Sequence, residues 1–139
     1  MMSAAEKACP IIIRRHDGRR QVLAFAHPLA GRQFVKGGIE TGESPRDAAV
    51  RELREESGLI APSPPILPGV QAIGADRRPW HFLLFRCPGL PDRRSHRTGD
   101  DSGHDFAFFW HPLDRAPDET WHPIFNEAFA FFAPLVASR

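Results

Sequence analysis

Two short runs of β-branched and aliphatic residues near the N-terminus predict a pair of strands. The first run begins at Ile11 to Ile13, and the second covers Val22 to Ala26. Between them, His16-Asp17-Gly18 carries the Asp-Gly pair that is typical of a tight hairpin turn. A shorter extended piece, Gln33 to Val35, leads into a glycine-containing loop, Lys36 to Gly42. The pattern therefore predicts an N-terminal hairpin followed by a loop with unusual backbone freedom.

The segment after this loop carries the signals of a helix. Ser44 can cap it, Pro45 suits the first helical position, and Asp47 completes a variant of the capping box. We expect the helix to run to about Ser57, where Gly58 supplies a left-handed stop. Three glutamates share one helical face, and a different face suits the core. The glutamates are Glu52, Glu55 and Glu56, and the core candidates are Val50, Leu53 and Ser57.

The rest of the chain predicts further strands and a closing helix. Proline-rich Ala61 to Pro68 is expected to be a loop, and polar Gly89 to Gly103 an exposed one. Strands are expected at Val70 to Ile73, Trp80 to Cys87 and Asp105 to His111. A last helix opens at Pro123, and its apolar residues recur at helical spacing: Phe125, Ala128, Phe129, Phe132 and Leu135.

This order of elements indicates a mixed sheet flanked by helices in one α/β domain that covers residues 1–139. The composition fits, since 42% of the 139 residues are hydrophobic and 25% are charged. The formal net charge of +1 does not call for nucleic acid or a membrane as partner. No apolar stretch approaches the roughly 20 residues that span a bilayer. Two cysteines without metal or redox spacing favour a reducing, cytoplasmic location.

Three carboxylates on one helical face repel one another, which a divalent cation would reverse. Mg²⁺ prefers oxygen ligands and commonly bridges protein carboxylates to substrate phosphates. A solvated helix with ordinary ion pairs is the competing interpretation of the helix taken alone. Arg51 can pair with Glu55 one turn later, and Glu43 stands where a carboxylate can brace the loop against the helix.

The loop and helix together satisfy the pattern G-x5-E-x7-R-E-U-x-E-E-x-G-U, in which U is aliphatic. Every fixed position is present between Gly37 and Leu59, so a chance match is very improbable. The chain thus resembles the Nudix hydrolase family. That resemblance implies an α/β/α sandwich around a mixed sheet, and attack of water on a phosphorus atom of a nucleoside diphosphate derivative.

The resemblance also implies roles for individual residues. Glu52 and Glu56 would be the principal ligands of Mg²⁺, with Mn²⁺ as a second candidate ion, and Glu55 would assist. A backbone carbonyl of Lys36 or Gly37 would complete the protein ligands. By the same resemblance, Glu43 and Arg51 would be structural braces of the catalytic motif.

Several residues have more than one candidate role. Glu52 is the first choice for the general base, and Asp105 and the Asp100-Asp101 pair are alternatives that also suit turns. Val35-Lys36 stands where the family frequently has a proline-glycine pair, which is a departure from the family pattern. Lys36, next to the metal loop, could contact a substrate phosphate as a point charge or be a solvated loop lysine. Trp80 is the best candidate for stacking on a nucleobase, although aromatic residues more often pack in a core.

The sequence supports a hydrolase acting on a small nucleotide-type substrate, without nucleic acid as an expected partner. A Nudix-fold module that senses a nucleotide without cleaving it is the alternative, and the intact glutamates argue against it. A homodimer is compatible with the family. The base and the leaving group are not encoded in any recognisable motif, because substrate choice depends on loops.

Overall fold

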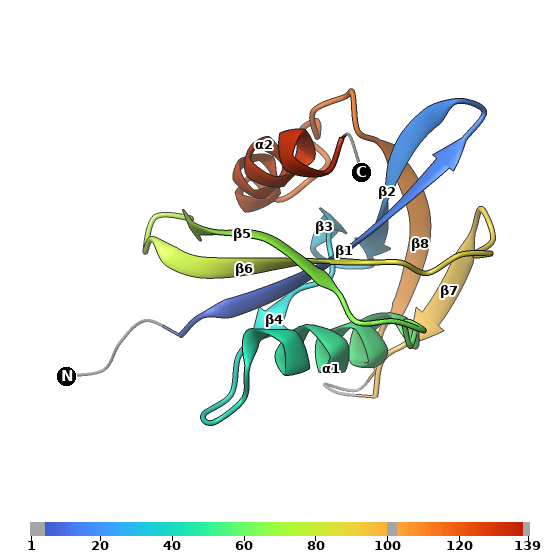
Figure 1. The fold of residues 1–139 in the computed structure, drawn as a ribbon. Helices are drawn as coiled ribbons and strands as arrows, with labels where there is room; N and C mark the ends of the chain where they lie inside the picture. Colours follow the sequence, from blue (N-terminus) through green and yellow to red (C-terminus); the bar gives the residue numbers. More distant parts are fainter. Residues whose placement is uncertain (1–4, 100–102, 138–139) are drawn as a thin grey trace.

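The computed structural model describes residues 5–99 and 103–137 and contains a mixed sheet and two helices (Figure 1). The strands are β1 (Lys7–His16), β2 (Arg19–His27), β3 (Gly31–Gln33), β4 (Gly37–Gly38), β5 (Ile66–Ile73), β6 (Arg78–Phe85), β7 (Arg94–Arg97) and β8 (Asp105–Pro112). The helices are α1 (Pro45–Ser57) and α2 (Ile124–Val136). None of the described helices is long and apolar enough to cross a membrane.

The sheet runs in the order β5-β6-β1-β2-β8-β7, with β3 beside β2 and β4 beside β1. β1 and β6 are parallel, whereas the other pairs are antiparallel. Helices α1 and α2 lie on opposite faces of the strands (Figure 1). Each helix covers its own apolar cluster, one around Phe82 and Phe132 and the other around Phe25 and Leu53. The expected α/β/α sandwich with a mixed sheet is confirmed.

The expected hairpin is present between β1 and β2. Its register pairs His16 with Arg19, which leaves Asp17 and Gly18 as the two turn residues. Both have positive φ angles, 51° for Asp17 and 76° for Gly18. Such a turn suits the right-handed twist of two antiparallel strands, which explains the Asp-Gly pair.

Several expected boundaries differ from those in the structure. The extended piece expected at Gln33 to Val35 is a strand that already ends at Gln33. The loop expected to reach Pro68 is shorter, because β5 begins at Ile66 and pairs there with Leu84.

The exposed loop expected from Gly89 to Gly103 contains a strand, β7, paired with β8. Its polar side chains dock on the end of α1: Arg94 donates to the carbonyl of Ser57, and His96 lies 3.2 Å from that of Glu55. The last carbonyls of a helix have no hydrogen-bond donor within the helix. Polar side chains of a neighbouring strand can bind these carbonyls and so hold that strand in place.

Each helix buries a slightly different face from the one expected. In α1, Leu53 and Ser57 are buried as expected, but Val50 is 41% exposed and Ala48, Ala49 and Glu52 are buried instead. The buried face is therefore centred closer to the glutamate face. In α2, Leu135 is 39% exposed, whereas the other four expected apolar residues are buried.

Candidate active site

Helix α1 has a capping residue at each end. The hydroxyl of Ser44 accepts a hydrogen bond of 3.0 Å from the backbone N–H of Asp47, and Pro45 occupies the first turn. Gly58 closes the helix with a φ of 76°. These caps hold the register of the helix, and the register decides which way the three glutamates face.

Arg51 connects the glycine-containing loop to the glutamate face. Its guanidinium donates twice to Glu43, at 2.8 Å each, and donates to the carbonyl of Gly38 at 2.8 Å. It also reaches Glu52 at 2.8 Å and Glu55 at 3.2 Å. Bidentate contacts of this kind are the strongest pairs between arginine and a carboxylate. Glu43 and Arg51 therefore lie where braces between loop and helix would have to lie.

This network perturbs the titration of both braces. The hydrogen bond from Arg51 lowers the pKa of Glu43 to about 2, and the backbone N–H of Glu40 adds to the effect. Glu43 in turn raises the pKa of Arg51 above its ordinary value, despite the opposing effect of burial. Both groups are consequently charged at neutral pH.

Gly37 allows the carboxylate of Glu52 to lie against the loop backbone. A Cβ atom at Gly37 would overlap the carboxyl carbon and both carboxyl oxygens of Glu52. A Cβ at the neighbouring Gly38 would meet nothing within 4 Å. The requirement for glycine at position 37 therefore comes from the site itself and not from the conformation of the loop.

The three glutamates line one cavity of about 580 Å³ together with Lys36. Of the residues expected to hold a metal, four thus share one cavity, and Gly37 lies against the carboxylate of one of them. Glu52 is 9% exposed, whereas the side chain of Glu55 is 50% exposed. The cavity combines carboxylate oxygens with one lysine ammonium group, and it has room for the phosphate groups of a nucleotide.

Sequence reasoning missed the other walls of this cavity, which include His27, Gln33, Thr98 and Phe106. The imidazole of His27 lies 5.1 Å from the ring of Phe106. Partial burial, followed by the neighbouring His104 and Lys36, lowers the pKa of His27. These residues come from β2, β3, β8 and the segment after β7, and no local motif connects them.

Two expected site residues lie elsewhere. Trp80 is 3% exposed and packs in the core against Phe82 and Phe125, so it offers no face to a nucleobase. Asp105 is exposed and pairs with Arg97 at 3.1 Å, and it does not line the glutamate cavity. The alternative bases Asp100 and Asp101 lie outside the described residues.

The donor atoms in the cavity suit a hard divalent cation such as Mg²⁺. In the described ranges, no three His, Cys, Asp or Glu side chains come close enough together to enclose an ion by themselves. Mg²⁺ usually keeps several waters and takes only one or two protein carboxylates, with substrate phosphates as further ligands. The carboxylates of Glu52, Glu55 and Glu56 line the same cavity, and two of them would meet that requirement.

Curated relatives of this chain include proteins named RNA pyrophosphohydrolase. The protein from Xanthomonas campestris is 35% identical over 89 residues, which cover 63% of this chain and 38% of the relative. The protein from Halorhodospira halophila is 40% identical over 84 residues, covering 60% and 41%, respectively. The matched region thus spans less than half the length of these relatives.

A solved structure of the Ap4A hydrolase from C. elegans, described as a binary complex, superposes with a TM-score of 0.68 at 17% identity. The superposition covers 96% of this chain and 100% of that one, and it shows that the fold is shared. The family described as NUDIX domain matches residues 6–130, which include all the strands and most of α2. The chain therefore belongs to the NUDIX domain family.

Proposed function

We propose that this protein hydrolyses a diphosphate linkage in a nucleoside diphosphate derivative, with a divalent cation, Mg²⁺ or Mn²⁺, as cofactor. The observation that carries the proposal is the complete motif whose Glu52, Glu55 and Glu56 line a single cavity with Lys36. A silent member of the family would have no need to keep three mutually repelling carboxylates on one helical face.

Each motif residue has a distinct part in this proposal. Glu52 and Glu56 are the principal carboxylate ligands, Glu55 assists, and the backbone carbonyl of Lys36 or Gly37 adds a further oxygen. The bound cation would neutralise the diphosphate and lower the pKa of an attacking water. Lys36 places a positive charge on the same cavity, where it can contact a phosphate oxygen.

Glu52 is the general base in this proposal. Glu52 is 9% exposed, and its carboxylate lies against the loop at Gly37 and receives a hydrogen bond from Arg51. A base must lie within hydrogen-bond reach of the water that it deprotonates, and such fixed placement favours Glu52. Asp105 is a weaker choice, because it is already paired with Arg97 away from the cavity.

The substrate class divides into two candidates. A free nucleotide, nucleotide sugar or dinucleoside polyphosphate suits the size of the cavity. The 5′ end of an RNA is the second candidate, favoured by the names of the relatives. The net charge of +1 gives no independent support to RNA, which usually demands a strongly basic surface.

The test is a panel of nucleoside triphosphates, nucleotide sugars, dinucleoside polyphosphates and a 5′-triphosphorylated RNA, incubated with Mg²⁺. Released phosphate products are measured for the natural chain and for Glu56→Gln. Turnover of one class that is lost in Glu56→Gln supports the proposal and names the substrate. Tight Mg²⁺-dependent binding of a nucleotide without any turnover contradicts it and favours the sensing module.

A further inference from the structure

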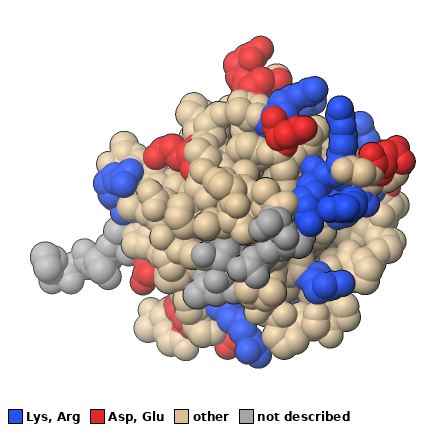
Figure 2. Space-filling view, turned by 45° about the horizontal axis from the view of Figure 1, so that its top comes forward, with Lys and Arg blue, Asp and Glu red and all other residues tan. Residues whose placement is uncertain are grey.

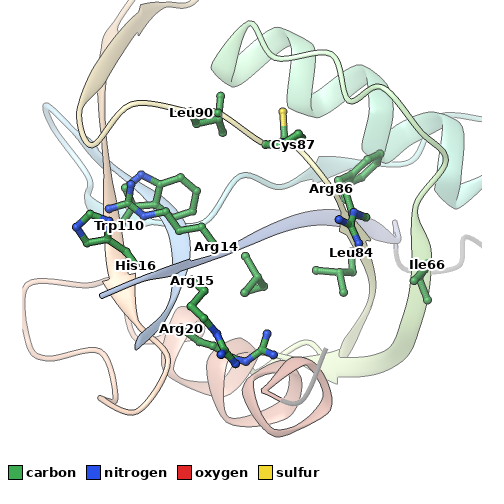
Figure 3. Close-up of a pocket in the computed structure, with 14 residues that line it drawn as sticks. Arg14, Arg15, His16, Arg20, Ile66, Leu84, Arg86, Cys87, Leu90 and Trp110 are labelled. Atoms are coloured by element: carbon green, nitrogen blue, oxygen red, sulfur yellow. The ribbon is translucent and has the colours of Figure 1, made fainter. Parts of the chain in front are cut away.

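A second and larger cavity opens where β1 and β6 separate. The two strands pair in parallel up to Ile12 and Phe85. Beyond Ile12, β1 pairs with β2 alone within the described residues, while the chain after β6 turns away through Cys87. A cavity of about 700 Å³ lies in this fork (Figure 3), which is called here the β1–β6 notch.

The notch combines an apolar floor with a basic rim. Ile13, Leu84 and Leu90 contribute apolar surface. Four arginines also line the notch, and they are Arg14, Arg15, Arg20 and Arg86. In Figure 2, Lys and Arg side chains gather on one side of the surface, toward the side on which Figure 1 shows the β1–β2 hairpin.

The arginines differ in whether their guanidinium groups already have partners within the protein. Arg14 lies over the ring of Trp110 at 4.4 Å and pairs with Asp92 at 2.7 Å. Arg15 and Arg86 are exposed, and neither guanidinium group has an ion-pair or hydrogen-bond partner in residues 5–99 and 103–137. Two guanidinium groups are thus available at the rim, each with five donors suited to a phosphate group.

The notch is separate from the glutamate cavity. The two cavities share no lining residue. Arg20 lines the notch near the start of β2, and His27 lines the glutamate cavity at the end of that strand. Seven residues of strand separate these positions, which corresponds to roughly 23 Å. The two cavities therefore lie toward opposite ends of β2.

We propose that the β1–β6 notch is a second ligand site that binds a mononucleotide-sized anion. The phosphate group pairs with Arg15 and Arg86 at the rim, and the ring system rests on the apolar floor. The volume lies in the range of small-molecule sites, about 300–1,000 Å³. The edge of β1 that loses β6 beyond Ile12 also offers peptide groups to the edge of a base.

Calorimetric titration with ADP in the presence of EDTA tests this site without metal-dependent catalysis. The titration is made on Glu56→Gln, in which the notch is intact, and on the same chain with Arg15→Gln and Arg86→Gln added. Arg19→Gln is the matched control, because Arg19 is an exposed arginine of the same hairpin that does not line the notch.

The proposal expects ADP to bind with an affinity that falls by about tenfold or more when both rim arginines are replaced. Adenosine, which lacks the phosphate groups, should bind much more weakly than ADP. The Arg19→Gln control should change the affinity by less than about twofold, because Arg19 does not line the notch and can act on the ligand only through water.

Three outcomes overturn the proposal. Absence of ADP binding tighter than about 1 mM removes the site. An equal loss of affinity in Arg19→Gln and in the double variant would show that ADP is attracted by the overall positive charge of the hairpin and not by the two rim arginines. Binding of a single-stranded oligonucleotide but not of ADP makes the notch part of a nucleic-acid surface. None of these outcomes affects the proposed hydrolase function, which does not involve the notch.

Discussion

Two neighbouring glycines, Gly37 and Gly38, differ in what a side chain would meet. A Cβ at Gly37 would occupy the place of the Glu52 carboxylate, whereas a Cβ at Gly38 would point into open space. Gly38 nevertheless contributes its carbonyl to Arg51. At the scale of single residues, the motif therefore requires glycine at position 37 for the site and tolerates a methyl group at position 38.

Replacing Gly37 with alanine should displace Glu52 from the loop and lower the hydrolysis rate by roughly 100-fold, since a shift of about 1 Å in a catalytic group has effects of that size. The matched Gly38→Ala variant should keep its rate within about threefold of the natural chain. The comparison uses initial rates on the best substrate of the panel. Equal loss in both variants would show that the loop, and not the Glu52 contact, carries the effect.

The ion pair of Glu43 and Arg51 predicts a pH dependence of stability. Folding lowers the pKa of Glu43 from about 4.5 to about 2, mainly through the hydrogen bond from Arg51. A carboxyl whose pKa is lowered by folding stabilises the fold above its unfolded pKa, and the stabilisation disappears as the pH falls through the folded value. Glu43→Gln should therefore unfold at a lower temperature than the natural chain above pH 4.5.

That difference in unfolding temperature should narrow between about pH 4.5 and pH 2 and vanish near the lower limit. Circular dichroism melts of both chains across this range measure it directly. A difference of constant size from pH 7 down to pH 2 would mean that Glu43 acts through packing and not through its charge.

At the scale of elements, α1 is the part that the sequence predicts best. Its signals are local: Ser44 and Asp47 form the cap, and Gly58 has a φ of 76° at the end. Strand β7 lacks such signals, because Arg94 and His96 find their partners on α1, far away in the sequence. The core position of Trp80 has the same kind of origin, since Phe125 of α2, far away in the sequence, packs against it.

Removal of the cap should weaken α1 measurably. Ser44→Ala deletes the 3.0 Å hydrogen bond to the N–H of Asp47 and should cost about 1 kcal/mol of unfolding free energy. In a chain of this size that corresponds to a fall of about 3–5 °C in Tm. Ser44→Asp, which keeps an acceptor at the cap, should restore most of the loss. An unchanged Tm in Ser44→Ala would show that the cap does not contribute to stability and that α1 is stabilised by its packing alone.

At the scale of the whole molecule, the glutamate cavity is assembled from distant parts of the chain. The motif supplies one wall, and His27, Thr98 and Phe106 supply others. The sequence predicts the wall that carries the three glutamates because its spacing is periodic, but not the opposite walls, which depend on strand order. The sequence does not predict the β1–β6 notch either, because the notch forms at the point where two strands separate.

In the proposed function, the glutamate cavity hydrolyses a diphosphate linkage with the help of a divalent cation. The most direct test is the initial rate on the best substrate, measured against Mg²⁺ concentration for the natural chain, Glu52→Gln and the exposed control Glu119→Gln. We expect no rate without the ion, a saturable rise with it, and a loss of roughly 100-fold or more in Glu52→Gln alone. A rate that is independent of Mg²⁺, or that survives intact in Glu52→Gln, would contradict the proposed function.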